Sequence, residues 1–184
     1  MNRRSFLFLS GSARRDGNTD ILAREAAAHL PEDTVQRWVR LADLVLPVFV
    51  DIRHEGDGAY PQPAGDARLL LDATLAATDI VIASPLYWYS VTAATKLYLD
   101  HWSGWMRVPQ VDFRARMAGK TMWAITVVSD DDHRHADPLV GTLRLTAEYL
   151  RMNWGGTLIG FGNRPGDVLL DTQTLAAAKA FLSV

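Results

Sequence analysis

Residues 9–19 read Leu9-Ser10-Gly11-Ser12-Ala13-Arg14-Arg15-Asp16-Gly17-Asn18-Thr19. They form a polar loop between an apolar run at residues 6–9, which predicts a β-strand, and a helical pattern that begins near Ile21. A strand, a loop and a helix in this order present backbone N–H groups and the positive end of the helix dipole to an anion. Ser10, Ser12, Asn18 and Thr19 add side-chain donors, and Arg14 adds a permanent positive charge. The stretch predicts a phosphate-binding loop.

The glycine spacing excludes two common kinds of phosphate-binding loop. A nucleoside triphosphate loop needs G-x-x-x-x-G-K-[S/T], but here Gly17 comes one residue late and Asn18 follows it in place of lysine. The dinucleotide pattern G-x-G-x-x-G is also missing, because the next glycine after Gly11 is Gly17. Hydroxyl and amide donors around one arginine suit a terminal phosphate monoester, and FMN is the common cofactor of that kind. An ordinary strand-to-helix turn capped by Asn18 or Thr19 is the alternative.

Composition excludes several classes of protein. The chain has 184 residues, of which 48% are apolar, so we expect one domain spanning residues 1–184 with a sizeable core. A formal net charge of −2 does not favour nucleic acid or an anionic membrane surface as partner. The absence of cysteine excludes disulfides, thiolate catalysis and a protein-held iron–sulfur cluster. The apolar run at residues 6–9 is too short for a signal peptide or a membrane span, so we expect a soluble, cytoplasmic protein.

Short apolar runs alternate with helical patterns along the chain. The runs lie at residues 6–9, 35–39, 80–83, 121–128 and 157–160, and the later helical patterns at 66–78, 92–105, 137–150 and 172–182. Asp137 and Pro138 read as the N-cap and the first helical residue of the clearest helix. The alternation predicts an α/β fold: a doubly wound, five-stranded parallel sheet of order 2-1-3-4-5, with helices on both faces. Residues 41–66 are expected to form a long connection with an exposed tip.

The loop after the third expected strand should border the same crevice as the phosphate loop, because ligands bind beyond the carboxyl ends of parallel strands. It reads Ser84-Pro85-Leu86-Tyr87-Trp88-Tyr89-Ser90. Three consecutive aromatic residues beside a proline can form a platform for a flat ring. The alternative is that Tyr87, Trp88 and Tyr89 cap the core or fill a subunit contact.

The loop after the fourth expected strand should border the other side of such a ring. It runs from Ser129 to Asp137 and contains Asp130, Asp131, Asp132, His133 and His135. Clustered carboxylates more often mark a solvated loop than a metal site, and Asp137 is needed as a helix cap, so no metal is predicted. Aspartate and histidine at this rim could instead contact an incoming substrate.

The helical pattern at residues 92–105 carries two further features. Lys96 and Asp100 share one helical face, where a solvated ion pair is expected. Trp102, Trp105 and Met106 at its end could form a homodimer patch or pack in the core.

Taken together, the chain resembles the NAD(P)H-dependent FMN reductases of the flavodoxin-like superfamily. Residues 11–19 resemble the family's G-S-x-R-x-x-S-N-T phosphate loop, with Gly17 in place of its serine. Ser84-Pro85-Leu86-Tyr87 with Lys96 and Asp100 resembles its S-P-x-Y…K…D segment. Some relatives carry a cysteine cluster after the second strand, and this chain resembles only the cluster-free branch.

The resemblance implies FMN as cofactor, NAD(P)H as hydride donor and usually a homodimer. One set of residues would hold the FMN phosphate: Ser10, Ser12, Arg14, Gly17, Asn18 and Thr19. A second set would surround the isoalloxazine ring, with the last two closing its far side: Pro85, Leu86, Tyr87, Trp88, Tyr89, Ser129 and Asp130.

The resulting hypothesis is an FMN-dependent oxidoreductase working by ping-pong transfer to a small-molecule acceptor: a quinone, an azo or nitro compound, or flavin. Because flavin supplies the chemistry, no catalytic side chain is predicted. A flavodoxin-type electron carrier is one alternative, although such carriers tend to be strongly acidic. A non-enzymatic module of the same fold, binding another phosphate ligand, is the second.

Overall fold

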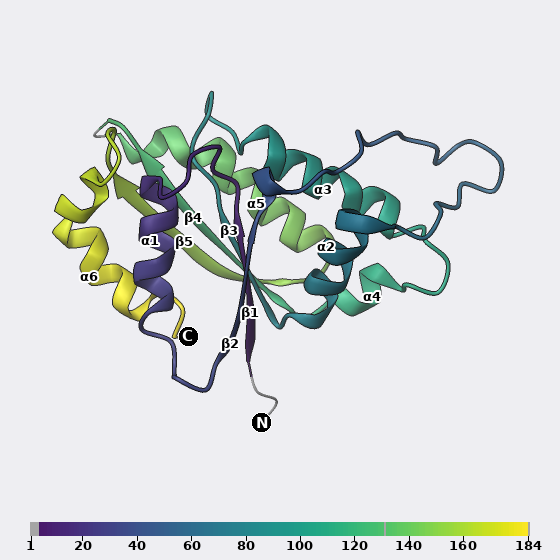
Figure 1. Cartoon of the computed structure of the whole chain (residues 1–184), viewed down its shortest axis with the longest axis horizontal. Helices are drawn as coiled ribbons and strands as arrows, with labels where there is room; N and C mark the ends of the chain where they lie inside the picture. The colour runs from purple at the N-terminus through teal and green to yellow at the C-terminus, as the bar shows by residue number, and fades with distance from the viewer. Residues whose placement is uncertain (1–3, 131, 184) are drawn as a thin grey trace.

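The computed structural model describes residues 4–130 and 132–183, so Asp131 of the acidic loop lies outside the described residues. Within these ranges the chain forms one parallel sheet of order β2-β1-β3-β4-β5 (Figure 1). Its strands are β1 (Ser5–Ser10), β2 (Val35–Arg40), β3 (Asp79–Ala83), β4 (Thr121–Val128) and β5 (Asn153–Phe161). The predicted five-stranded sheet and its order are confirmed.

Helices cover both faces of this sheet, also as predicted (Figure 1). One face packs against α1 (Asn18–Ala27) and α6 (Thr172–Phe181). The other packs against α2 (Gly65–Ala76), α3 (Ala93–Trp105), α4 (Phe113–Met117) and α5 (Asp137–Tyr149). Right-handed crossovers between parallel strands produce this two-sided arrangement.

The two apolar cores follow from the alternation of side chains along each strand. In β3, Ile80 and Ile82 are buried against the α2–α3 side, whereas Val81 and Ala83 are buried against the α1–α6 side. Strands β1 and β4 divide their side chains in the same way. A strand covered on both faces is apolar at every position, which is why these runs show little polar alternation.

Some expected boundaries and roles change in the structure. Strand β5 begins at Asn153 rather than at residue 157, and the short α4 had no predicted counterpart. Ala136 is the N-cap of α5, so Asp137 is the first helical residue and not the cap. Trp102 and Trp105 are 3% exposed and pack in the core around Tyr98 and Phe113, so these two residues do not form a surface patch. They occupy the inward stripe of α3, four and seven residues after Tyr98.

The connection between β2 and α2, residues 41–64, begins with a short 3₁₀ turn, Leu41–Asp43, and then extends away from the sheet (Figure 1). We call it the excursion. The Tyr60 ring lies against Gly104 of α3, where a β-carbon would come within 2.8 Å of it. The Tyr60 hydroxyl accepts a hydrogen bond from the Ile52 N–H (2.9 Å) and donates one to the Val50 carbonyl (3.1 Å). Together with α3 the excursion borders an apolar groove of about 420 Å³.

None of the helices within the described ranges is long and apolar enough to span a membrane.

Candidate functional site

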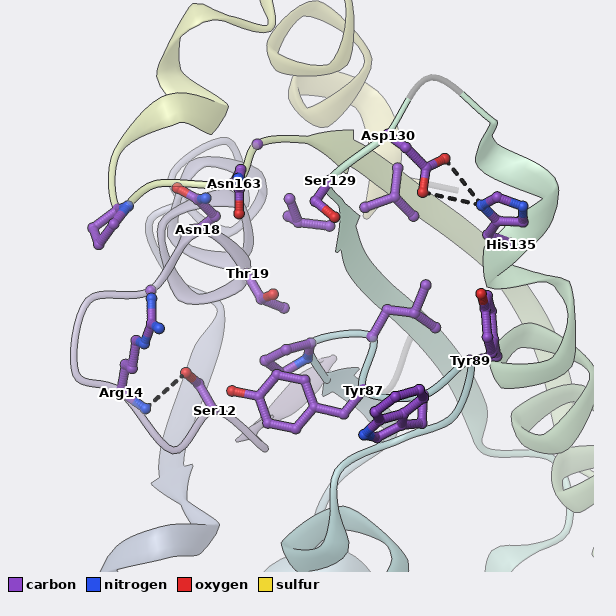
Figure 2. A pocket seen from close by; sticks show the side chains of 18 of the residues that line it. Ser12, Arg14, Asn18, Thr19, Tyr87, Tyr89, Ser129, Asp130, His135 and Asn163 are labelled. Atoms are coloured by element: carbon purple, nitrogen blue, oxygen red, sulfur yellow. Dashed lines mark hydrogen bonds and ion pairs between the residues drawn. The ribbon is translucent and has the colours of Figure 1, made fainter.

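A cavity of about 410 Å³ opens at the carboxyl edge of the sheet, between the loops that follow β1, β3, β4 and β5 (Figure 2). This is the edge at which parallel α/β sheets bind ligands. The volume lies within the range of small-molecule pockets. The lining is made by Ser12, Arg14, Arg15, Gly17, Asn18, Thr19, Pro85, Leu86, Tyr87, Trp88, Tyr89, Val127, Val128, Ser129, Asp130, His135, Gly162, Asn163 and Pro165.

The loop after β1 is fixed by its neighbours. The Gly11 N–H donates to the Ala83 carbonyl of β3 (2.8 Å), and the Thr92 hydroxyl before α3 donates to the Gly11 carbonyl (2.8 Å). A β-carbon on Gly11 would lie 2.1 Å from the Thr95 hydroxyl oxygen, so only glycine allows this close approach. From the other side, Arg40 of β2 donates to the Ala13 carbonyl (2.8 Å). The loop is therefore held in place by three separate elements.

Helix α1 begins at this loop, with Gly17 as its N-cap in an extended conformation. Ser12 and Thr19 are each 2% exposed and line the cavity, and the Ser12 hydroxyl accepts the Arg14 N–H (3.1 Å). A β-carbon on Gly17 would approach the Ser12 hydroxyl oxygen to 3.0 Å, so the glycine leaves room for that hydroxyl. The first N–H groups of α1 have no partner inside the helix and point toward the loop.

Ser10 lies outside the cavity lining, in contrast to the other predicted phosphate-loop residues. Its hydroxyl is buried and donates to the Asp20 carboxylate at 2.5 Å. The alternation of β1 explains this placement, because Ser10 shares the α1 side of the strand with Phe6 and Phe8. Burial raises the pKa of Asp20, while the bond from Ser10 acts in the opposite direction.

Asn18 lines the cavity, but its side-chain amide is bonded elsewhere. The amide nitrogen donates to the Arg164 carbonyl (2.9 Å), and the amide oxygen accepts the Gly166 N–H (2.8 Å). Asn18 is the first residue of α1 rather than its N-cap. Its side chain braces the loop after β5 against α1, which brings Asn163 and Pro165 to the cavity.

The loop after β3 contains a tight hairpin turn. Tyr87 and Ser90 exchange two backbone hydrogen bonds, of 3.0 and 3.1 Å. Between them Trp88 and Tyr89 have positive φ angles of 50° and 63°, a conformation that glycine normally takes. The Trp88 side chain is 93% exposed. Two bulky residues are thus held in unfavourable backbone geometry with their rings outside the core.

The loop after β4 completes the wall opposite Arg14 (Figure 2). The His135 Nδ1 lies 3.0 Å from both carboxylate oxygens of Asp130, and its ring meets the Tyr89 ring edge-on at 5.7 Å. The hydrogen bond from His135 and the Asp132 N–H lower the pKa of Asp130. No three metal-ligating side chains gather in one place within residues 4–130 and 132–183.

Twelve of the thirteen predicted site residues meet at this cavity, and Ser10 is the exception. Of the other lining residues, His135 belongs to the loop whose aspartate and histidine side chains could contact a substrate, and six were not predicted: Arg15, Val127, Val128, Gly162, Asn163 and Pro165. The last strand is followed by a run of turn residues, Gly162-Asn163-Arg164-Pro165-Gly166. Because ligands bind beyond the carboxyl ends of parallel strands, this run is the sequence signal for the loop after β5. Lys96 and Asp100 form an exposed 2.5 Å ion pair on α3 and do not line the cavity.

Comparison with known proteins gives a consistent result. Residues 5–156 match the family described as NADPH-dependent FMN reductase. The chain is 30% identical over 175 residues to YwqN of Bacillus subtilis, which carries the name of an NAD(P)H-dependent FMN-containing oxidoreductase; the match covers 95% of this chain and 94% of that protein. An iron–sulfur flavoprotein of Methanocaldococcus jannaschii is 27% identical over 186 residues, covering 93% of this chain and 90% of the relative. The solved structure of a Trp repressor binding protein from Bacillus subtilis superposes with a TM-score of 0.75 at 27% identity, covering 96% and 97% of the two chains.

Proposed function

Since this chain belongs to the NADPH-dependent FMN reductase family, we propose that it binds FMN in the cavity at the carboxyl edge of the sheet, within one domain spanning residues 1–184. The bound flavin accepts a hydride from NAD(P)H and supplies the redox chemistry. The enzyme then reduces a second, small-molecule acceptor in a ping-pong sequence. The observation that carries the proposal is the meeting of a phosphate-type loop and an aromatic hairpin at one 410 Å³ cavity.

The loop between β1 and α1 fits a phosphate monoester. Ser12 and Thr19 bring hydroxyl groups to the cavity, and the first turn of α1 directs N–H groups and a positive dipole end toward it. Arg14 adds a guanidinium at the rim. Neighbouring Arg15 pairs with Asp43 at 3.2 Å, so its charge is partly directed to the 3₁₀ turn that follows β2. We therefore assign Arg14 the charged contact with the phosphate.

The hairpin after β3 and the loop after β4 fit a flat ring. Pro85, Leu86 and Tyr87 line one wall of the cavity, and Ser129 and Asp130 line the wall that the β4 loop forms. Ser84 stiffens the first wall, because its hydroxyl accepts the Thr92 N–H (3.1 Å) and its own N–H bonds to the Ile125 carbonyl (3.0 Å). These contacts support a preorganised ring site between β3 and β4.

A ping-pong sequence requires that the nicotinamide and the acceptor occupy the same exposed side of the ring in turn. The outer side of the proposed ring site is bordered by the half-exposed Tyr89 and by Trp88. Aromatic side chains of this kind can stack on a nicotinamide or on a flat acceptor such as a quinone or an azo compound. The exposure of Trp88 also supports a homodimer in which a second copy covers this ring. Analytical ultracentrifugation of wild type and W88A tests that part of the proposal.

The proposed activity is tested by an absorption spectrum of the purified protein with FMN, before and after anaerobic addition of NADPH or NADH. We expect flavin bands that shift on binding and bleach with at least one nucleotide, and the faster nucleotide is the preferred donor. Bands that bleach only with a chemical reductant would favour an electron carrier. An FMN spectrum that does not change in the presence of the protein would remove the function. Initial rates at several acceptor concentrations then test the order of the reaction steps, since ping-pong kinetics give parallel reciprocal plots.

A further inference from the structure

Asp130 and His135 form a hydrogen-bonded pair that faces the cavity (Figure 2). The lowered pKa of Asp130 keeps its carboxylate ionised, and an ionised carboxylate can only accept hydrogen bonds. The proton between the two groups is therefore on Nδ1 of His135. The other ring nitrogen, Nε2, is left to gain or lose a proton.

The pair is more than a solvated ion pair, although both side chains are about half exposed. The backbone N–H of Asp132 donates to one of these two carboxylate oxygens, Oδ1 of Asp130, at 3.0 Å, which fixes the carboxylate. On the other side, the Tyr89 ring supports the imidazole edge-on at 5.7 Å. The imidazole is thus held by two loops that follow different strands.

The position of the pair within the cavity also matters. Asp130 and His135 lie across the cavity from Arg14 and Ser12, as Figure 2 shows. If the phosphate lies at Arg14, the pair borders the ring end, where the acceptor must bind. This step rests on the function proposed above.

We propose that His135 is the proton donor for the acceptor half-reaction, and that Asp130 is its positioning residue. The substrate class is an acceptor with a carbonyl oxygen, such as a quinone, that becomes a hydroxyl on reduction. Such a reduction adds a hydride and a proton: the reduced flavin supplies the hydride, and the proton leaves Nε2 of the imidazolium to form the new O–H bond. The histidine is left neutral with its remaining proton on Nδ1, the form that Asp130 stabilises, and water restores the lost proton.

Several charged and titratable groups face this imidazole. Asp130 and Asp132 belong to its own loop, and Tyr89 approaches from the β3 hairpin. Arg134 is paired with Asp132 at 2.7 Å, so its charge is largely neutralised. Since the donor must carry its proton, we expect the rate of quinone reduction to fall as the pH rises and the imidazolium loses that proton.

The kinetic test compares two acceptors in one preparation. A quinone needs a proton in the transfer step, whereas ferricyanide takes only electrons, so the quotient of the two rates isolates proton donation. We expect H135Q to lower this quotient about a hundredfold, near the lower limit for general acid catalysis, and to flatten its pH dependence. D130N should lower it less. His133 lies outside the cavity lining, so H133Q is the matched control and should leave the quotient unchanged. An unchanged quotient in H135Q would overturn the proposal.

A second readout uses the protein without flavin or substrate. Imidazole ¹⁵N spectra should show neutral His135 protonated on Nδ1, and D130N should shift the proton toward Nε2. A neutral His135 protonated on Nε2 in the wild type would overturn the geometry. Wild-type protein that passes electrons from NAD(P)H to neither acceptor would instead overturn the proposed function, and the spectra would still test the pair.

Discussion

The hairpin at residues 87–90, which borders the cavity, and the excursion at residues 41–64 both contain residues in left-handed backbone conformation. The residue types at these left-handed positions differ between the two regions. In the excursion, Gly56 and Gly58 take positive φ angles of 56° and 69°. In the hairpin, Trp88 and Tyr89 take angles of 50° and 63°. Left-handed geometry costs an ordinary residue about 1–2 kcal/mol, and glycine avoids that cost.

The difference shows which region gives up stability for another purpose. The excursion follows the local rules of turn formation, because nothing there requires a side chain at the bends. The hairpin keeps two aromatic side chains at positions where glycine or asparagine would be more stable. Such strain persists where the residues have a role in binding or catalysis, and these two line the cavity.

The largest predicted effect tests whether the cavity alone carries the binding function. R14A should weaken FMN binding by about 1.5–3 kcal/mol, the value of a hydrogen bond to a charged group, which raises Kd about 10- to 150-fold. Fluorescence titration of FMN measures this change. R53A removes the same charge from the excursion, where Arg53 is paired with Asp51, and should leave Kd unchanged. Equal FMN affinity in R14A and wild type would show that this arginine does not hold the phosphate.

The second prediction places glycine at a left-handed position of the hairpin and a β-carbon at a left-handed position of the excursion. Y89G should raise the free energy of unfolding by about 1 kcal/mol, because relief of backbone strain exceeds the added chain entropy, and it should weaken FMN binding. G56A should lower the free energy of unfolding by about 1 kcal/mol with no change in FMN affinity. A β-carbon on Gly56 meets no neighbour, so the loss reports backbone strain alone. Urea unfolding measures both, and a stability loss in Y89G would contradict the comparison.

The two regions also differ in how far the sequence predicts them. The place of the loop after β1 at the cavity could be predicted because the strand, the loop and the helix are consecutive, and that of residues 84–90 because parallel strands end at one edge. The donor chemistry of Ser10 alone predicts a place in the loop site, but the alternation of β1 turns its hydroxyl toward Asp20. The excursion has no periodic pattern. Its packing depends on the contact between Tyr60 and Gly104, which are far apart in sequence.

The third prediction tests what holds the excursion. Y60F removes the hydroxyl that bonds the Ile52 N–H and the Val50 carbonyl, and it should lower the free energy of unfolding by about 1 kcal/mol. Hydrogen exchange at Ile52 should speed up, since its amide loses the acceptor. FMN affinity should match the wild type, because Tyr60 does not line the cavity. A change in Kd would show that the excursion and the cavity are coupled.

The smallest effect is a difference in pH dependence between the two regions. In the excursion, hydrogen bonds from Arg53 lower the pKa of Asp51 from the ordinary 3.8 to about 2. The stabilisation from ionised Asp51 is therefore fully present above pH 3.8 and is lost as the pH falls through about 2. Beside the loop after β1, burial raises the pKa of Asp20, so the ionised Asp20 lowers the free energy of unfolding, and stability is lost as the pH rises above 3.8, the ordinary pKa of aspartate. In urea unfolding, D51N should lose stability relative to the wild type as the pH rises through its window. D20N, whose amide oxygen can still accept the hydrogen bond from Ser10, should gain stability relative to the wild type as the pH rises above 3.8. Slopes of the same sign in the two variants would contradict these assignments.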